Sequence, residues 1–332
     1  MELLLTGTSG DLGWPAPGCA CASCLGRPSR RAPFGAVVDG VVPVPYADVP
    51  PGYRVHAGGL GLTCPGGSRL LYAPAGREVP PGGEGRYDAV LVDLLERPER
   101  LGAMRRAGLV DERTHVVAVG LDHRARSEDE LARRLELWGA RAVPDGTVLD
   151  TGRPPPPPVA APRRTLLLGG SRSGKSAEAE LRLAAEPYVT YVATGPAGEG
   201  DGEWAARVRA HRVRRPAHWA TAETTELAEV IGAATGPLLV DGLGTWLAAV
   251  FDEHAAWEGD RAPVERRCDE LVRAWRTAPH RVVAVSDEVG MGVVPATASG
   301  RAFRDALGRL NERLAAESED VALVVAGRLL RL

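Results

Sequence analysis

Lysine, phenylalanine, methionine and long apolar runs are scarce in this sequence. Lys175 is the only lysine among 40 basic residues, and the chain has only 3 Phe and 3 Met. No apolar run reaches the ~20 residues of a membrane-spanning helix, and the N-terminus lacks the charged and apolar regions of a secretory signal. The 43 acidic residues balance the basic ones, which excludes the broad positive surface that binds nucleic acid. We therefore expect a cytoplasmic protein with no membrane span and no nucleic-acid partner.

The length predicts two domains, because 332 residues exceed the roughly 100 to 200 residues of a usual single domain. The strongest break lies at residues 151–164, TGRPPPPPVAAPRR, where five consecutive prolines predict a stiff polyproline spacer. We place the domains at residues 1–150 and 164–332, joined by a linker at 151–163.

Apolar runs and helical patterns alternate after the linker. We expect strands at 165–168, 189–193, 237–240, 281–285 and 321–325, and helices at 175–185, 203–213, 225–234, 245–254, 263–275 and 300–316. Continuous apolar strands alternating with helices are typical of a mainly parallel sheet that is covered on both faces. The fold class predicted for this half is therefore α/β.

The first half has shorter β-like runs and fewer helical patterns. We expect strands at 2–5, 35–44, 68–72, 88–92 and 115–119, helices at 98–107 and 127–138, and a loop rich in Gly, Pro and Cys at 6–28. These runs indicate a domain that contains both strands and helices.

A glycine-rich motif follows the first apolar strand after the linker and precedes a helical pattern. Its residues are Gly169, Gly170, Ser171, Arg172, Ser173, Gly174, Lys175 and Ser176. In the pattern G-x4-G-K-S, backbone N–H groups surround phosphate oxygens, the lysine reaches the β- and γ-phosphates, and the last hydroxyl ligates Mg²⁺. The motif uses the only lysine of the chain, where the wide fork of arginine cannot replace a compact ammonium. It predicts a site for a nucleoside triphosphate.

Asp241 ends the apolar run Pro-Leu-Leu-Val-Asp and is the candidate second ligand of the magnesium. A carboxylate at the end of a neighbouring buried strand suits this role. The alternative is that Asp241 caps the helix that begins near Gly244, and both roles are compatible.

Several further motifs carry a resemblance to a known family. They are GGSRSGKS, R-x3-H-R followed by RPAHW-x-T-x-E, LLVDGLGTWL, EVGMGVVP and R-x-FRD-x2-GRLN. From Arg164 to the end, the chain resembles the bifunctional adenosylcobinamide kinase and adenosylcobinamide-phosphate guanylyltransferase of cobalamin biosynthesis. The resemblance implies phosphate transfer from ATP or GTP to the aminopropanol hydroxyl of adenosylcobinamide, then GMP transfer from GTP to adenosylcobinamide phosphate with release of pyrophosphate. It also implies a homo-oligomer, by analogy a trimer.

The resemblance further implies that a histidine carries GMP between the two substrates, and His211 is the matching position. A neutral imidazole is a suitable nucleophile at the α-phosphate. His218, beside Trp219, is the alternative, and we expect it to be structural or close to the guanine. This chain departs from the family at Asp287, where Asn is usual.

Three cysteines, Cys19, Cys21 and Cys24, lie within six residues. In a cytoplasmic protein such spacing favours a metal over disulfides, and thiolates suit Zn²⁺ with a fourth N or S ligand. The alternative is three free thiols.

The N-terminal stretch LLLTGTSGDLGWPAPGCACASC resembles the phosphodiesterase branch of the metallo-β-lactamase fold. The resemblance implies a structural zinc whose late histidine ligand is His123. It places Gly120 where a catalytic metal ligand is usual, and the chain has no H-x-H-x-D-H motif. We therefore expect a shortened domain without hydrolytic activity.

Two alternative functions remain open from the sequence. One is a phosphate-loop kinase of another hydroxyl compound, in which His211 has no role. The other is a nucleotide-binding regulatory module without turnover.

Overall fold

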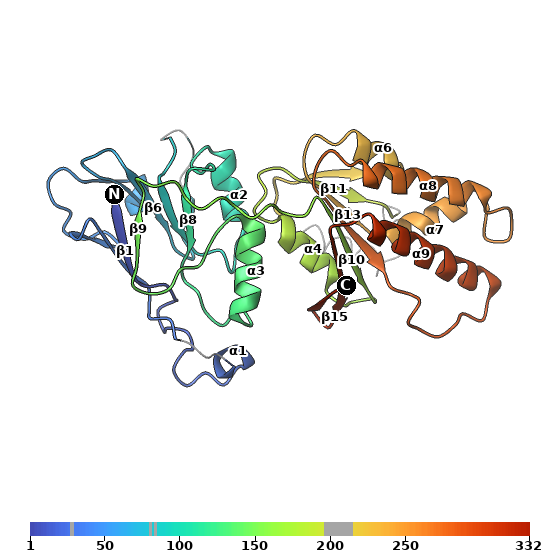
Figure 1. Ribbon diagram of the computed structural model, residues 1–332, viewed down its shortest axis with the longest axis horizontal. Helices are drawn as coiled ribbons and strands as arrows, with labels where there is room; N and C mark the ends of the chain where they lie inside the picture. The colour runs from blue at the N-terminus through green and yellow to red at the C-terminus, as the bar shows by residue number, and fades with distance from the viewer. Residues whose placement is uncertain (27–29, 80–81, 83–84, 196–214) are drawn as a thin grey trace. The chain divides into compact units, whose positions relative to one another are not determined.

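The computed structural model describes residues 1–26, 30–79, 82, 85–195 and 215–332. The chain forms two compact units (Figure 1). The first comprises Met1–Ala160 and Ala184–Pro187, and the second comprises Ala161–Leu183 and Tyr188–Leu332. No described helix combines the length and the apolar character needed to span a membrane.

The second unit is built on a seven-stranded sheet. In spatial order its strands are β12 (Ala220–Glu223), β11 (Thr190–Ala193), β13 (Leu238–Asp241), β14 (Val282–Asp287), β10 (Arg164–Gly169), β15 (Asp320–Val325) and β16 (Arg328–Arg331). Every neighbouring pair is parallel except β15 and β16. The prediction of a mainly parallel sheet is confirmed for this unit.

Helices lie on both faces of this sheet (Figure 1). They are α4 (Lys175–Leu183), α6 (Leu227–Gly232), α7 (Leu243–Glu253), α8 (Ala262–Arg276) and α9 (Ala298–Ala316). Leu166 and Leu168 belong to the core cluster shared with α6 to α9, whereas Leu167 belongs to the cluster shared with α4. Successive side chains of a strand point to opposite faces, so this division explains the continuous apolar run. The helix expected at 203–213 lies outside the described residues.

The first unit contains two sheets. One is antiparallel, with β3 (Val42–Val44), β2 (Gly35–Val38), β1 (Glu2–Gly7) and β9 (Thr147–Asp150) in that order. The other is mixed, with β4 (Arg54–His56), β5 (Gly61–Thr63), β6 (Arg69–Ala73), β7 (Ala89–Val92) and β8 (His115–Ala118). Leu3 and Leu5 of the first sheet share one buried cluster with Leu62 and Leu91 of the second. The helices are α1 (Ala22–Leu25), α2 (Glu99–Arg106) and α3 (Glu128–Trp138), with a 3-10 turn η1 at Ala57–Gly59.

The single strand expected at 35–44 is wrong, because this segment is a hairpin of β2 and β3. Asp39 and Gly40 at the turn have φ of 50° and 72°. Asp-Gly is a preferred pair for the tight turns of hairpins, because both residues tolerate positive φ. The strands β4, β5 and β9 were also not expected.

The short segment Ala184–Pro187 belongs to the first unit although it follows α4 directly. Arg105 of α2 donates hydrogen bonds to the carbonyls of Ala185 (2.7 Å) and Trp138 (2.8 Å). A Cβ on Gly102 would lie 2.6 Å from the carbonyl oxygen of Glu186, so glycine is required there. Nothing in the sequence pattern predicted that residues after α4 would belong to the first unit.

Candidate nucleotide-binding site

The glycine-rich loop connects the end of β10 to the start of α4. At Gly174 φ is +98°, and a Cβ there would lie 3.2 Å from Cα of Gly327. A Cβ on Gly169 would lie 2.6 Å from the Ser173 hydroxyl oxygen. Only glycine relieves both the positive φ and the close approach, so the loop's fold depends on these two positions. Gly327 N also donates to the carbonyl of Ser173 (2.7 Å), which fixes the loop against the turn after β15.

Lys175 begins α4 and lies across the loop. Its Nζ donates to the carbonyl of Gly170 (3.0 Å) and lies 2.8 Å from Oδ1 of Asp287. The side chain is only 10% exposed. A compact ammonium fits this space, and it lies in the loop where a phosphate oxygen would meet it.

Asp241, at the end of β13, has a separate hydroxyl donor on each carboxylate oxygen. Ser176 Oγ donates to Oδ1 (3.0 Å) and Tyr191 Oη donates to Oδ2 (2.7 Å). Burial, with the charge of Asp241, raises the pKa of Tyr191, so its hydroxyl remains a donor. The N-cap of α7 is Gly242, the residue after Asp241. Tyr191 lies in an expected strand, but its hydrogen bond to Asp241 could not be predicted without knowing that β11 and β13 are neighbours in the sheet.

The strand order explains why these residues meet. Since β13, β14 and β10 are adjacent and parallel, their carboxyl ends lie at one edge of the sheet. Ligands of open α/β sheets bind at this edge. Asp241, Asp287 and the glycine-rich loop therefore form one site, although they are far apart in the sequence.

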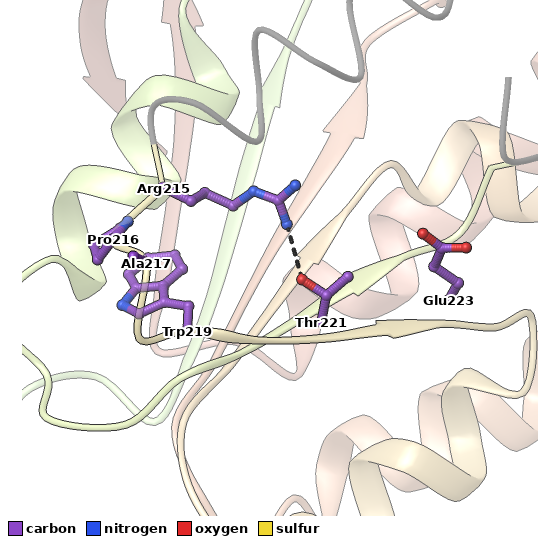
Figure 2. A pocket seen from close by; sticks show the side chains of 6 residues that line it. All are labelled: Arg215, Pro216, Ala217, Trp219, Thr221 and Glu223. Atoms are coloured by element: carbon purple, nitrogen blue, oxygen red, sulfur yellow. Dashed lines mark hydrogen bonds between the residues drawn. The ribbon is translucent and has the colours of Figure 1, made fainter.

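A pocket of about 320 Å³ lies along β12 (Figure 2). Its lining residues are Arg215, Pro216, Ala217, Trp219, Thr221 and Glu223. The Arg215 guanidinium lies 3.7 Å from the centre of the Tyr191 ring and donates to Thr221 Oγ1 (3.4 Å). Tyr191 thus contacts both a wall of the pocket and Asp241, which connects the pocket to the candidate metal carboxylate. The motif RPAHW-x-T-x-E marks this segment in the sequence, but nothing in the motif predicts that its residues line a pocket.

His211 and His218 are the two candidates for the nucleophilic histidine. His211 lies outside the described residues. His218 lies between two residues that line the pocket, and its Nε2 is buried.

The cysteines of the first unit come together with His123. The ligand atoms of Cys19, Cys21, Cys24 and His123 all lie within 4.8 Å of one another. His123 Nδ1 is 3.6 Å from Sγ of Cys19 and 3.8 Å from Sγ of Cys24. The backbone amide of Cys24 lowers the pKa of the Cys21 thiol, whereas burial raises that of Cys24.

An arginine lies next to Gly120, where the resemblance places a catalytic ligand. Arg124 pairs with Asp93 (2.8 Å) and Asp122 (2.8 Å) and donates to the carbonyl of Gly120 (2.8 Å). Burial raises the pKa of Asp93, and the Arg124 hydrogen bond opposes this rise. A Cβ on Gly120 would lie 2.8 Å from Asp93 Oδ2, so this position requires glycine.

The fold and site of the second unit define a phosphate-loop nucleotide-binding protein. A glycine-rich loop joins the parallel strand β10 to a helix that begins with Lys-Ser, and β13 of the same sheet ends in a carboxylate that accepts a hydrogen bond from this serine. Residues 165–332 match the family described as cobinamide kinase / cobinamide phosphate guanyltransferase. The chain belongs to this family of transferases.

Three relatives match about half of this chain and nearly all of their own length. The bifunctional adenosylcobalamin biosynthesis protein CobU of Salmonella typhimurium is 42% identical over 48% of this chain and 93% of its own. CobU of Escherichia coli is 37% identical over 48% and 93%. CobP of Pseudomonas aeruginosa is 42% identical over 48% and 91%. An ATPase structure from a type III secretion system aligns over 48% of this chain and 50% of its own, at a TM-score of 0.33 and 13% identity, which supports no argument.

Proposed function

We propose that residues 164–332 catalyse both reactions of the family on adenosylcobinamide. In the first, the acceptor hydroxyl oxygen bonds to the γ-phosphorus of ATP or GTP, the bond to the β-phosphate oxygen breaks, and the hydroxyl proton leaves to solvent. The observation that carries this proposal is the assembled phosphate loop, with Lys175 buried in it and Ser176 bonded to Asp241. Lys175 neutralises charge on the β- and γ-phosphates.

Mg²⁺ fits the oxygen donors of Ser176 and Asp241. A serine hydroxyl and an aspartate carboxylate are the ligands that this ion takes from phosphate-loop proteins that bind nucleotides. When bound, the ion offsets negative charge on the β- and γ-phosphates. Tyr191 holds the carboxylate in position through its 2.7 Å hydrogen bond.

We propose that His211 carries GMP in the second reaction. A ring nitrogen forms a bond to the α-phosphorus of GTP, and the bond to the β-phosphate oxygen breaks to release pyrophosphate. An oxygen of adenosylcobinamide phosphate then bonds to the same phosphorus and frees the histidine. This order divides one displacement into two, each in line at one phosphorus.

The test is incubation with α-labelled GTP, Mg²⁺ and the full chain. We expect label that is stable in alkali and labile in acid on the wild type and on His218→Ala. We expect no label on His211→Ala, while its transfer of γ-phosphate to cobinamide persists. An active kinase whose wild-type form takes no label would favour a kinase of another hydroxyl compound. Absence of pyrophosphate release with phosphorylated cobinamide would favour a regulatory module.

We propose that the pocket along β12 holds the purine base. Trp219, 8% exposed, offers an aromatic wall, and Glu223 offers a carboxylate. Guanine presents two adjacent N–H donors on its pairing edge, which a carboxylate accepts together, whereas adenine lacks that pair. Glu223→Gln should therefore lower the preference for GTP over ATP in equilibrium binding, and an unchanged preference would remove Glu223 from this role.

We propose that the first unit is a metallo-β-lactamase-like domain that holds a structural Zn²⁺ through Cys19, Cys21, Cys24 and His123. Tetrahedral coordination with Zn–S of ~2.3 Å and Zn–N of ~2.0 to 2.1 Å sets sulfur and nitrogen about 3.6 Å apart. The distances from His123 Nδ1 to Sγ of Cys19 and of Cys24, 3.6 and 3.8 Å, are close to this value. The two sheets that enclose a common core support the proposed fold class.

Metal analysis of the purified full chain tests the zinc. We expect one zinc per chain, lost in Cys24→Ser and retained in Cys64→Ser, a matched change at another buried cysteine of the same unit. Three free thiols in metal-replete protein, counted with a thiol reagent, would contradict the proposal.

A further inference from the structure

The phosphate-binding ammonium of this chain already has an anionic partner within the protein. Lys175 Nζ lies 2.8 Å from Asp287 Oδ1. The lysine side chain is 10% exposed and the aspartate side chain 40% exposed. The pair therefore lies at the mouth of the site, with the cation inside and the carboxylate toward solvent.

The position of Asp287 is fixed from three sides. Asp287 lies opposite Gly169 in the register of the parallel strands β14 and β10, beside the phosphate loop. Asn311 of α9 donates to its carbonyl (3.1 Å), and Ser286 Oγ donates to Asn311 Oδ1 (2.6 Å). A Cβ on Gly244 would lie 2.7 Å from its Oδ2, so the first turn of α7 leaves just enough room for the carboxylate.

This second carboxylate oxygen lies against the N-terminal turn of α7, an 11-residue helix. The start of a helix carries a partial positive charge that stabilises an anion. The carboxylate thus lies between an ammonium and a helix start, both favourable to its charge.

We propose that Asp287 is an intramolecular competitor of the nucleotide for Lys175, and that it weakens the binding of nucleoside triphosphates to this chain. The inference rests on the proposed function, in which Lys175 contacts the β- and γ-phosphates. When the nucleotide binds, its phosphate oxygens must replace the Asp287 carboxylate as the partner of Lys175 Nζ, or bind Nζ together with it. In either case the negative charge of Asp287 remains close to the arriving phosphates and opposes them.

Asparagine is the matched replacement, and it is also the residue that the family resemblance leads us to expect here. It has the shape of aspartate but no charge, and its NH₂ group can donate to a phosphate oxygen. An ionised aspartate can only accept hydrogen bonds. An aspartate at this position therefore places an anion beside the phosphates, where an asparagine would place a neutral donor.

The first measurement is the Kd of ATP and of GTP with Mg²⁺ for the full chain, without cobinamide. We expect Asp287→Asn to bind both about fivefold more tightly than the wild type, because an ion pair whose carboxylate is 40% exposed is worth up to about 1 kcal/mol. Glu288→Gln removes the same charge one residue further along. Its Oε1 accepts from Gly290 N (2.8 Å), so its Kd should equal that of the wild type.

The second measurement uses the single lysine of the chain. Acylation of Lys175, followed by peptide mass, reports on one side chain and separates it from the N-terminal amine. Without nucleotide, we expect several-fold faster acylation in Asp287→Asn than in the wild type, because the carboxylate no longer holds Nζ. Nucleotide should protect both forms, and a merely structural effect on folding would not produce this pattern.

The outcomes separate this inference from the proposed function. If the wild type binds neither nucleotide, both are wrong. If the wild type binds and Asp287→Asn binds equally or more weakly, only the competition is wrong. Equal acylation rates in the two forms without nucleotide would also overturn it.

Discussion

Replacing Tyr191 with phenylalanine removes one hydroxyl from the candidate magnesium site. That hydroxyl donates to Asp241 Oδ2 at 2.7 Å, and Ser176 holds the other oxygen at 3.0 Å. The phenyl ring keeps the shape of the side chain, which is 5% exposed, and keeps the face on which Arg215 lies. We expect the carboxylate to lose its orientation toward the metal while the fold persists.

The size of the effect follows from the bond that is lost. A buried hydrogen bond to a charged acceptor contributes about 1.5 to 3 kcal/mol. Groups that orient a metal ligand typically account for about 10- to 100-fold in metal affinity. Because the pKa of Tyr191 is raised by burial and by Asp241, its hydroxyl is a donor at every ordinary assay pH.

The assay is cobinamide phosphorylation at saturating nucleotide as free Mg²⁺ is varied. We expect Tyr191→Phe to require about 10- to 100-fold more Mg²⁺ for half of the maximal rate. Tyr188→Phe makes the same chemical change at a side chain that is 65% exposed and should behave as the wild type. If Tyr191→Phe shows the wild-type requirement, Tyr191 does not orient a metal ligand.

Three further predictions concern single side chains. Lys175→Arg should weaken ATP and GTP binding by about 100-fold in equilibrium dialysis, because the wide guanidinium does not fit a space where the lysine is 10% exposed. Asp241→Asn should raise the Mg²⁺ requirement as Tyr191→Phe does, measured in the same assay. Burial, with a smaller effect from the charge of Arg141, lowers the pKa of His115 below its unfolded value of ~6.5. The unfolded chain then binds the proton first, so stability in urea should fall as pH drops below about 6.5, and His115→Gln should reduce that fall.

Periodicity predicted most of the elements that have a buried apolar face and missed strands that are short or exposed, such as the three-residue β5. The expected run at 281–285 became β14, buried throughout except at Asp287. The edge strand β12, Ala-Thr-Ala-Glu, has three exposed residues of four, so no apolar pattern marks it. The hairpin of β2 and β3 did carry a signal, the pair Asp39-Gly40, which the apolar run on both sides obscured.

Some features of the site were likewise predictable from the sequence, and others depend on the strand order. The phosphate loop was predictable because its parts are contiguous in the sequence, and Asp241 because it ends an apolar strand. The pairing of Lys175 with Asp287 joins residues separated by more than a hundred positions, and it depends on β14 being the neighbour of β10. Asp287 itself was noted in the sequence, but its pairing with Lys175 was not predicted.

The two carboxylates at this sheet edge differ in their partners, and the partners determine what each can do. Asp241 accepts hydrogen bonds from two neutral hydroxyls, those of Ser176 and Tyr191, and we propose that it contributes its charge to a cation that arrives with the nucleotide. Asp287 has an ammonium beside it, so its charge is already compensated by the group that the phosphates need. Removing each charge should therefore have opposite effects: weaker use of Mg²⁺ at Asp241, and tighter binding of the triphosphate at Asp287. Two acidic residues on adjacent strands of one sheet are thus expected to act in opposite directions on the same ligand.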